Sequence, residues 1–326
     1  MQLRFLQVEP TTRCNYRCGF CAGRHLPQGD LDPQRLREFL AGIEGLEHVE
    51  LQGEGEPLLH PRFFDLATAV RERFPAAGLS LITNGSLFSD EHIDGLLRHG
   101  FARVFVSMES ADAERFRQIR GGRFDRVTQG VAALMAERRR RNLALPTVGL
   151  AVTVLRDTVD EATDSVLPFY RAHALDGGIT IQPLQPMPQY LRFYDAEMRA
   201  QLLQPAQSRR LQQRIAATPD LQAAMRERGR HPGFFEQLYG SVAGRPLCPW
   251  LSHGLFLGHD GAVVACCFVK DSARHALGRD RIDLAQVAQQ RAALAGALAA
   301  GRVPEPCSGC GVAHRVAAAA PGAFSR

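Results

Sequence analysis

Hydrophobic and polar residues follow two periodicities along the first 185 positions, and these predict strands and helices in regular succession. Short apolar runs typical of buried strands occupy residues 3–8, 49–52, 79–83, 103–107, 147–155 and 179–182. Between these runs apolar residues recur every three or four positions, as in Leu36, Leu40 and Ile43, which is the spacing of an amphipathic helix. Six such alternations favour parallel βα units. We therefore expect an α/β fold with a partial (β/α)6 TIM-like barrel, which stays open because six units cannot close an eight-stranded ring.

The pattern changes after residue 185. Residues 186–245 predict a helical connecting segment. Residues 254–266 predict a β-hairpin that turns at residues 259–261, because the Asp-Gly pair in this turn tolerates positive φ. An alanine-rich helix is expected over 284–300, whereas residues 311–326 show no pattern and are expected to fray. We predict four segments, which are a core over 1–185, the connecting segment over 186–245, a small α+β domain over 246–312 and a C-terminal tail over 313–326.

Composition narrows the class of protein. The 326 residues are 45% hydrophobic and 22% charged, which excludes wholesale disorder. The net charge of +5 is too small to indicate a nucleic-acid partner, although four arginines run from Arg138 to Arg141. No apolar stretch reaches the length of about 18 residues that a membrane span requires, and we find no signal peptide. We therefore expect a cytoplasmic protein with no membrane partner, in a reducing compartment where grouped cysteines indicate metal or redox chemistry.

The eight cysteines fall into two groups. The first group has the spacing CxxxCxxC, and no cysteine follows it until residue 248. Scattered structural cysteines would not leave so long a gap, so the grouping predicts two metal sites. The first group is Cys14, Cys18 and Cys21, and the second is Cys248, Cys266, Cys267, Cys307 and Cys310.

Three thiolates on one loop suit a cubane iron–sulfur cluster in which one iron has no protein ligand. Such an open iron can bind a small chelating molecule, and an open coordination position is what catalysis requires. A zinc site with three cysteines is the alternative, with His25 available as a fourth ligand. The spacing alone leaves both interpretations open.

Residues 14–21, CNYRCGFC, resemble the signature of radical S-adenosylmethionine (SAM) enzymes, including an aromatic residue, Phe20, before the last cysteine. The resemblance implies that Cys14, Cys18 and Cys21 hold a [4Fe–4S] cluster whose open iron is chelated by SAM. It implies reductive cleavage of SAM to a 5′-deoxyadenosyl radical, which abstracts a hydrogen atom from a substrate C–H. The cofactor would carry this chemistry while the protein orients the reactants. A flavodoxin- or ferredoxin-type protein is the implied electron donor.

Further segments resemble SAM-binding motifs of the same family, in the same order along the chain. Gly55 and Glu56 resemble the turn that meets the SAM amino group, although Glu54 stands where the family usually has glycine. Ser107 and Glu109 resemble the fourth-strand motif that hydrogen-bonds the ribose hydroxyls, with glutamate where aspartate is commoner. The SAM-binding residues that the resemblance implies are Phe20, Gly55, Glu56, Asn84, Ser107, Glu109 and Arg120.

The later cysteines resemble the auxiliary-cluster extension called SPASM, in its shortened twitch form. The resemblance implies that Cys248, Cys266, Cys307 and Cys310 fully ligate a second [4Fe–4S] cluster. A structural zinc ribbon is the alternative, although it would usually show two CxxC pairs and this segment has one. Cys267 is left over. It is either a buried thiol or a hydrogen-atom donor that quenches a substrate radical and inverts a stereocentre.

A fully ligated second cluster implies an acceptor for an electron from a substrate radical. The layout of the motifs also resembles that of family members in antibiotic biosynthesis, which implies an oxidoreductase (dehydrogenase) or an epimerase that acts on a small carbohydrate or aminoglycoside-like substrate. Radical maturation of a ribosomally made peptide is an alternative, because relatives with such extensions modify peptides. A non-catalytic iron–sulfur carrier or zinc-binding module is the alternative from another class, but it explains the cysteines and not the SAM-binding segments.

Overall fold

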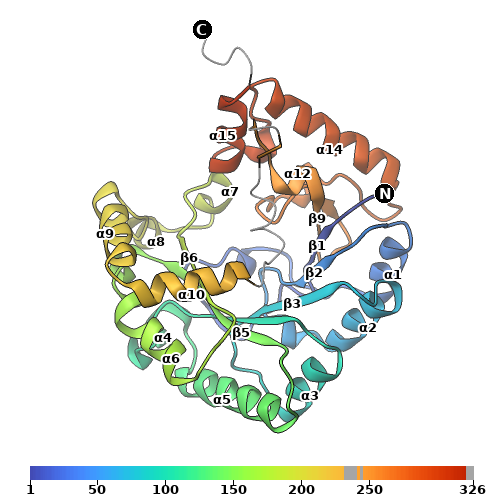
Figure 1. Ribbon diagram of the computed structural model, residues 1–326. Helices are drawn as coiled ribbons and strands as arrows, with labels where there is room; N and C mark the ends of the chain where they lie inside the picture. The colour runs from blue at the N-terminus through green and yellow to red at the C-terminus, as the bar shows by residue number, and fades with distance from the viewer. Residues whose placement is uncertain (231–240, 243–244, 321–326) are drawn as a thin grey trace.

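A mostly parallel β-sheet organises the molecule (Figure 1). The computed structural model describes residues 1–230, 241–242 and 245–320. The order of the eight strands in the sheet is β10-β9-β1-β2-β3-β4-β5-β6, and every neighbouring pair is parallel except β9 and β10. The strands are β1 Phe5–Val8, β2 His48–Leu51, β3 Gly78–Thr83, β4 Arg103–Ser107, β5 Thr147–Val154, β6 Ile179–Pro183, β9 Gly254–Leu257 and β10 Val263–Val264. Strands β1 to β6 are the six expected strands, and the expected α/β fold with a partial barrel is confirmed.

Helices connect these strands and surround the sheet on its outer side (Figure 1). They are α1 Pro33–Ala41, α2 Phe63–Arg73, α3 Asp90–Arg98, α4 Ala113–Arg120, α5 Phe124–Arg140 and α6 Leu167–Ala172, with short turns at η1 Gly23–His25, η2 Pro57–Leu59, η3 Arg156–Thr158 and η4 Ala162–Val166. Helix α1 shows how the sequence forms these helices, with a capping residue and a buried face. Asp32 caps it by accepting a hydrogen bond from the Gln34 N–H, and its buried residues include Leu36 and Leu40. No helix in the described part of the chain is long and apolar enough to cross a membrane.

The segment after β6 is helical, as the sequence predicted, apart from residues 231–240 and 243–244, which lie outside the described residues. Its elements are α7 Pro188–Leu191, α8 Ala196–Ala200, α9 Pro205–Ala216, α10 Pro219–Arg230 and the strand pair β7 Ser241–Val242 and β8 Arg245–Pro246. Helix α10 lies against β6 and buries Leu221 and Ala224. It therefore covers part of the edge strand that an open barrel leaves without a partner.

The C-terminal segment differs from the sequence prediction at its end. Its elements are α12 Pro249–His253, β9, β10, α13 Ser272–His275, α14 Leu284–Ala299, η5 Glu305–Cys307 and α15 Gly311–Ala318. The expected hairpin is present, and because β9 pairs in parallel with β1, it extends the barrel sheet. Where an unpatterned tail was expected, α15 buries Ala313 and Ala317, one turn apart, and contacts α14. Alanine gives too little hydrophobic contrast for this face to be visible in the sequence.

Gly149 in β5 offers a test of how tightly the last two strands of the barrel pack. A Cβ at this position would stand 2.5 Å from the carbonyl oxygen of Gly178 and 2.6 Å from Cε1 of Phe105. We expect Gly149→Ala to lower the free energy of unfolding by about 1–3 kcal/mol, measured by urea denaturation. Gly296→Ala is the matched control, because nothing lies within 4 Å of its added Cβ in α14, and it should be neutral or stabilise by up to about 1 kcal/mol. Equal stability of the two variants would contradict the close approach.

Candidate active site

The barrel encloses a cavity of about 520 Å³ with a polar row across it. The row arises from strand register, since Gln7 pairs with Glu50, Glu50 with Ser80 and Ser80 with Arg103, and all four line the cavity. Ser80 Oγ donates to Glu50 Oε2 at 3.3 Å and lies 2.8 Å from His48 Nε2. Burial lowers the pKa of His48 to about 3, so its imidazole is neutral. A row of hydrogen-bonding side chains therefore crosses a cavity that apolar and aromatic residues also line.

The N-terminal cysteines lie on the loop that follows β1, at the carboxyl end of the barrel strands where such folds place their chemistry. Cys14, Cys18 and Cys21 all line the cavity, so the structure brings the predicted triad together. The loop packs directly on Gly55. A Cβ there would meet backbone carbonyl oxygens of the loop at 2.4 and 2.6 Å. Glycine is required at this position by close backbone approach, which gives the predicted Gly55 a physical role.

The three thiols are neutral as they stand and would become thiolate ligands only beside a group that supplies positive charge. Burial raises the pKa of Cys14, of Cys18 to about 11, and of Cys21. Such a set stays protonated unless a positive group holds the thiolate form. Among the described residues, no three Cys, His, Asp or Glu side chains converge closely enough to hold a single metal ion. A cubane cluster binds each thiolate through a different iron and needs no such convergence, so this donor set fits an iron–sulfur cluster.

Glu56 and Asn84 also line the cavity and are linked to each other. The Glu56 carboxylate is 1% exposed and accepts hydrogen bonds from Thr83 Oγ1 at 2.7 Å, the Asn84 N–H at 2.6 Å and the Leu58 N–H at 3.1 Å. Burial raises the pKa of Glu56, and these hydrogen bonds oppose the rise. Asn84 Nδ2 donates to Asn15 Oδ1 on the cysteine loop at 2.8 Å. The carboxylate thus ties the loop after β2 to the end of β3 and, through Asn84, to the cysteines.

Arg120 and Glu109 form a buried ion pair beside the cysteine loop. Arg120 Nε lies 2.5 Å from Glu109 Oε2, and Nη2 lies 2.6 Å from Oε1. Arg120 Nη1 is 4.0 Å from Cys18 Sγ, and its guanidinium carbon is 6.0 Å from the centre of the Phe20 ring. Arg120, Phe20 and Ser107 line the cavity, whereas Glu109 is not among the lining residues. The structure therefore shows Glu109 as the counter-ion of Arg120, and its contact with the SAM ribose, which the resemblance implies, stays a prediction.

The later cysteines come from separate elements that the fold brings together. Cys248 precedes α12, Cys266 follows β10, Cys307 ends η5 and Cys310 precedes α15. Their thiols lie close enough to perturb one another's ionisation. Burial raises the pKa of Cys248, of Cys266 and of Cys307, the last to about 12. As at the N-terminal triad, this donor set fits a group that supplies positive charge.

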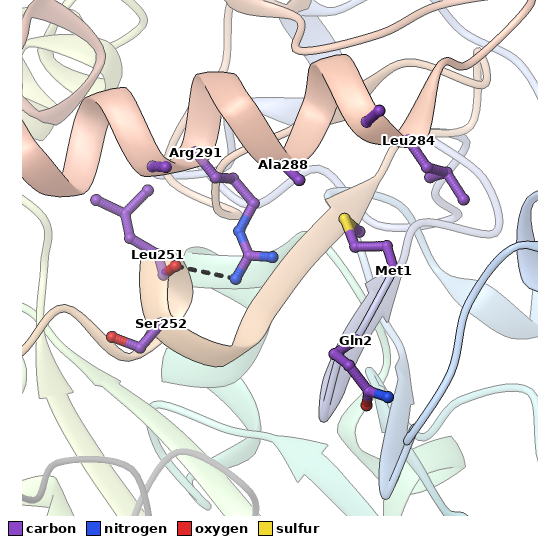
Figure 2. A pocket seen from close by; sticks show the side chains of 9 residues that line it. Met1, Gln2, Leu251, Ser252, Leu284, Ala288 and Arg291 are labelled. Atoms are coloured by element: carbon purple, nitrogen blue, oxygen red, sulfur yellow. Dashed lines mark hydrogen bonds between the residues drawn. The ribbon is translucent and has the colours of Figure 1, made fainter.

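Arg291 fixes the helix that begins at Cys248. This residue of α14 is buried, and its Nη2 donates to the Leu251 carbonyl at 2.9 Å (Figure 2). It also donates to the Trp250 carbonyl at 3.4 Å. These hydrogen bonds join α14 to α12 across 40 residues of sequence. The helix that follows Cys248 is therefore held by α14.

Cys267 faces the barrel cavity and lines it, whereas Cys266 is not among the lining residues. Phe268 and Lys270 from the same turn also line the cavity. Burial raises the pKa of Cys267 to about 12, so its sulfur is a neutral thiol. The structure thus places this thiol in the same cavity as the N-terminal triad.

Sequence reasoning missed Lys270, although a simple count singles it out. It is the only lysine in the chain, against 38 arginines. Its ammonium pairs with Glu54 on the loop after β2, and it lies 5.3 Å from the centre of the Tyr190 ring. The side chains of Lys270 and Glu54 are only 6% and 15% exposed. Burial alone would lower the pKa of Lys270, but the charge of Glu54 raises it well above its usual value.

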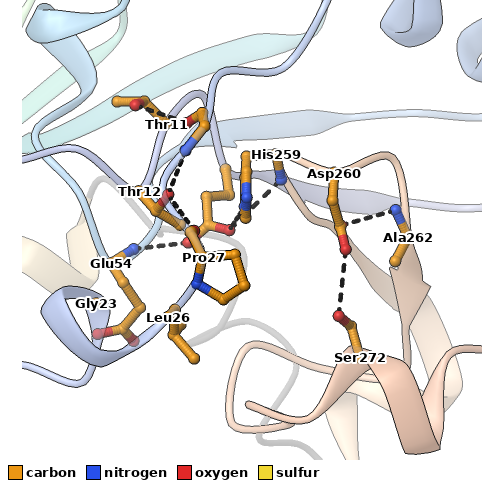
Figure 3. A network of polar contacts seen from close by, with 12 residues as sticks. Thr11, Thr12, Gly23, Leu26, Pro27, Glu54, His259, Asp260, Ala262 and Ser272 are labelled. Carbon is orange, nitrogen blue, oxygen red and sulfur yellow. Dashed lines mark hydrogen bonds and ion pairs between the residues drawn. The ribbon is translucent and has the colours of Figure 1, made fainter.

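A polar network joins the β9–β10 turn to the same loop (Figure 3). Glu9 follows β1 and accepts hydrogen bonds from the Glu54 N–H at 2.8 Å and from His259 Nδ1 at 3.0 Å. In the turn itself, Asp260 Oδ1 accepts from the Ala262 N–H at 3.0 Å. The added hairpin is therefore attached to the loop of residues 53–56 by a carboxylate that both share.

Comparison with known sequences places this site in a family. Residues 8–166 match the model described as the radical SAM superfamily. A tungsten-containing aldehyde ferredoxin oxidoreductase cofactor-modifying protein of Pyrococcus furiosus is 37% identical over 112 residues, which are 33% of this chain and 31% of that protein. A GTP 3',8-cyclase of Rhizobium meliloti is 31% identical over 196 residues, 56% of this chain and 52% of that protein. The chain thus spans about half or less of the length of these two relatives.

Solved structures share the fold. The enzyme anSMEcpe, with bound AdoMet and a Cp18Cys peptide, superposes with a TM-score of 0.68 at 17% identity, covering 94% of this chain and 85% of that one. SuiB of Streptococcus suis, bound to S-adenosylmethionine, gives a TM-score of 0.58 at 14% identity, covering 80% of this chain and 60% of that one. At these identities the likeness establishes the architecture.

The pair of Glu9 and His259 predicts a pH-dependent contribution to stability. Burial alone would lower the pKa of His259, but the hydrogen bond and charge of Glu9 raise it above 6.5. The charged pair therefore stabilises the fold fully below pH 6.5 and loses this effect as the pH rises through the raised pKa. We expect His259→Gln to lower the free energy of unfolding by about 1 kcal/mol at pH 6 and by less at pH 9, measured by urea denaturation. A loss that is the same at both pH values would contradict the pairing, and His275→Gln, at a partly exposed surface histidine, is the control.

Proposed function

Residues 8–166 form a radical SAM domain, so the chain belongs to the radical SAM superfamily, and from this premise we propose that it is a SAM-cleaving oxidoreductase or epimerase of a small hydroxylated substrate. The substrate class that we propose is a carbohydrate or aminoglycoside-like intermediate of natural-product biosynthesis. The observation that carries the proposal is a single cavity faced both by the cysteine triad and by Cys267. A radical generated at the triad and a thiol suited to donate hydrogen would thus share one substrate.

We propose that Cys14, Cys18 and Cys21 hold the SAM-binding [4Fe–4S] cluster and that the four later cysteines of the sequence prediction hold an auxiliary [4Fe–4S] cluster. When bound, SAM and the first cluster supply the 5′-deoxyadenosyl radical, and the second cluster supplies an electron acceptor. The chain's own residues position these groups. Gly55 lets the cysteine loop approach the loop after β2, and Arg120 places a buried, paired cation near Cys18. A flavodoxin- or ferredoxin-type protein is the proposed electron donor.

The cavity supports a small substrate that is rich in hydroxyl groups. Its volume of about 520 Å³ lies within the range of small-molecule sites. Amide and hydroxyl side chains line its wall, and these both donate and accept hydrogen bonds as sugar hydroxyls do. They are Gln7, Gln52, Ser80, Thr153, Thr180, Gln182 and Gln185.

The charges in the wall argue against a triphosphate substrate, although several relatives are named GTP 3',8-cyclases. Of the three Arg and Lys side chains in the wall, Arg120 has a carboxylate partner in Glu109 and Lys270 has one in Glu54, and the third is Arg103. A triphosphate needs cations whose charge is not already neutralised. A peptide substrate is the second candidate, because the structural neighbour anSMEcpe is described with a bound peptide.

Isotope transfer tests the proposed reaction. The holoenzyme, given SAM, a reductant and a deuterated aminocyclitol, should place deuterium in 5′-deoxyadenosine, detected by mass spectrometry. Cys18→Ala should abolish 5′-deoxyadenosine formation, because the cluster would lose one of its three thiolates. Transfer from GTP or from a peptide instead would redirect the substrate assignment. A wild-type protein that binds iron and makes no 5′-deoxyadenosine would favour a carrier over an enzyme.

Cys267 separates the two reaction outcomes. If the enzyme is an epimerase, Cys267→Ala should still consume SAM but fail to return hydrogen to the substrate radical, so epimer formation should fall by at least about tenfold. If it is a dehydrogenase, product formation should persist at a similar rate. Solvent deuterium in the product of the wild-type enzyme, absent in the variant, is the matching signature. Unchanged epimer formation by Cys267→Ala would remove Cys267 as the donor.

A further inference from the structure

The single lysine of the chain is buried, and buried positions are those in which lysines are rarest. The other 38 of the 39 Lys and Arg residues are arginines. Most of the arginines in the described residues form ion pairs at the surface. Lys270 instead lies in the cavity wall, buried, against Glu54 and the ring of Tyr190. Lysine carries a compact charge on a narrow stem, whereas arginine needs room for a planar fork. The exception therefore indicates a position where a compact cation is needed.

The partner of this lysine touches the cysteine loop. Glu54 Oε2 lies 3.8 Å from Cys21 Sγ, and the Glu54 carbonyl oxygen lies 3.4 Å from the same sulfur. A Cβ on Gly23 would stand 2.6 Å from that carbonyl oxygen, so the two loops are in direct contact. When Cys21 is a thiolate, the carboxylate of Glu54 becomes a second negative charge beside it. Glu54 is also the residue that replaces the usual glycine of the family motif.

We propose that Lys270 is a positioning residue that neutralises Glu54 beside Cys21 and thereby raises the reduction potential of the N-terminal cluster. This inference rests on the proposed role of Cys21 as a cluster ligand. Adding an electron to a cluster adds negative charge, and nearby charge of either sign shifts its potential. A bare carboxylate at Glu54 would oppose reduction, and the ammonium of Lys270 cancels that effect. The C-terminal turn that carries Lys270 thus compensates a departure in the N-terminal motif.

Other groups around Glu54 do not replace this charge. Tyr190 and Tyr194 lie near it, and burial raises the pKa of each, so both are neutral. Of the contacts that the structure assigns to the Glu54 side chain, Lys270 supplies the cationic one.

A double-substitution experiment tests the compensation. The midpoint potential of the holoenzyme is measured by following the electron paramagnetic resonance signal that changes when SAM is added, since this signal belongs to the N-terminal cluster. We expect Lys270→Met to shift that potential to a more negative value and to reduce the rate of 5′-deoxyadenosine formation. Glu54→Gly combined with Lys270→Met should return both toward the wild-type values, because the charge that needed neutralising is gone. Arg274→Met, which removes an exposed cation four residues away, is the matched control and should leave the potential unchanged.

The outcomes are distinct. If Lys270→Met fails to retain iron, recovery of the iron content in the double variant supports the proposal, and failure to recover overturns it. An unchanged potential in Lys270→Met, or a double variant as impaired as the single one, also overturns it. A wild-type protein that shows no SAM-sensitive signal would instead reject the proposed function itself.

Discussion

A charged side chain buried inside the barrel needs an oppositely charged partner beside it, and this constraint determines how the site is arranged. Moving an isolated ion out of water costs far more than one residue contributes to folding, so buried charges occur with partners. Glu109 faces Arg120, Glu54 faces Lys270 and Glu9 faces His259. The last two pairs join segments that are distant in sequence, whereas the first joins the residues after β4 to the end of α4. The electrostatic requirement therefore also fixes which loops meet around the cavity.

The same requirement explains how the C-terminal segment belongs to the barrel. Strand β9 satisfies the backbone hydrogen bonds of β1, and the hairpin turn that follows β9 is tied by His259 to Glu9. Lys270 then reaches the loop after β2 from just beyond this hairpin. Three contacts of different kinds thus attach one segment to the N-terminal part of the sheet. As a result, Cys267 lines the same cavity as the N-terminal cysteines, although it is more than 200 residues away from them in sequence.

The cavity suits a reaction that must exclude water and keep reactive groups in order. Its wall combines apolar and aromatic side chains with neutral hydrogen-bonding groups, and two of its three Arg and Lys side chains are paired with carboxylates. That balance favours orientation of a hydroxylated molecule over binding of a multiply charged one. The relatives have different named activities and match only part of the chain. The residues of the cavity wall therefore indicate the substrate more specifically than membership of the family does.

The sequence by itself determined the strand–helix order, the partial barrel and the grouping of the cysteines, because these depend on local periodicity and on spacing along the chain. It also indicated Gly55, Asn84 and Arg120, since short motifs preserve their order. It did not show that Glu109 pairs with Arg120, that Ala313 and Ala317 form a helix face, or that β9 joins β1. Those features depend on which distant segments pack together. Only the tertiary structure decided that Cys267 and the single lysine face the cavity, because the direction of a side chain in a turn is set by packing and ion pairing and not by its neighbours in sequence.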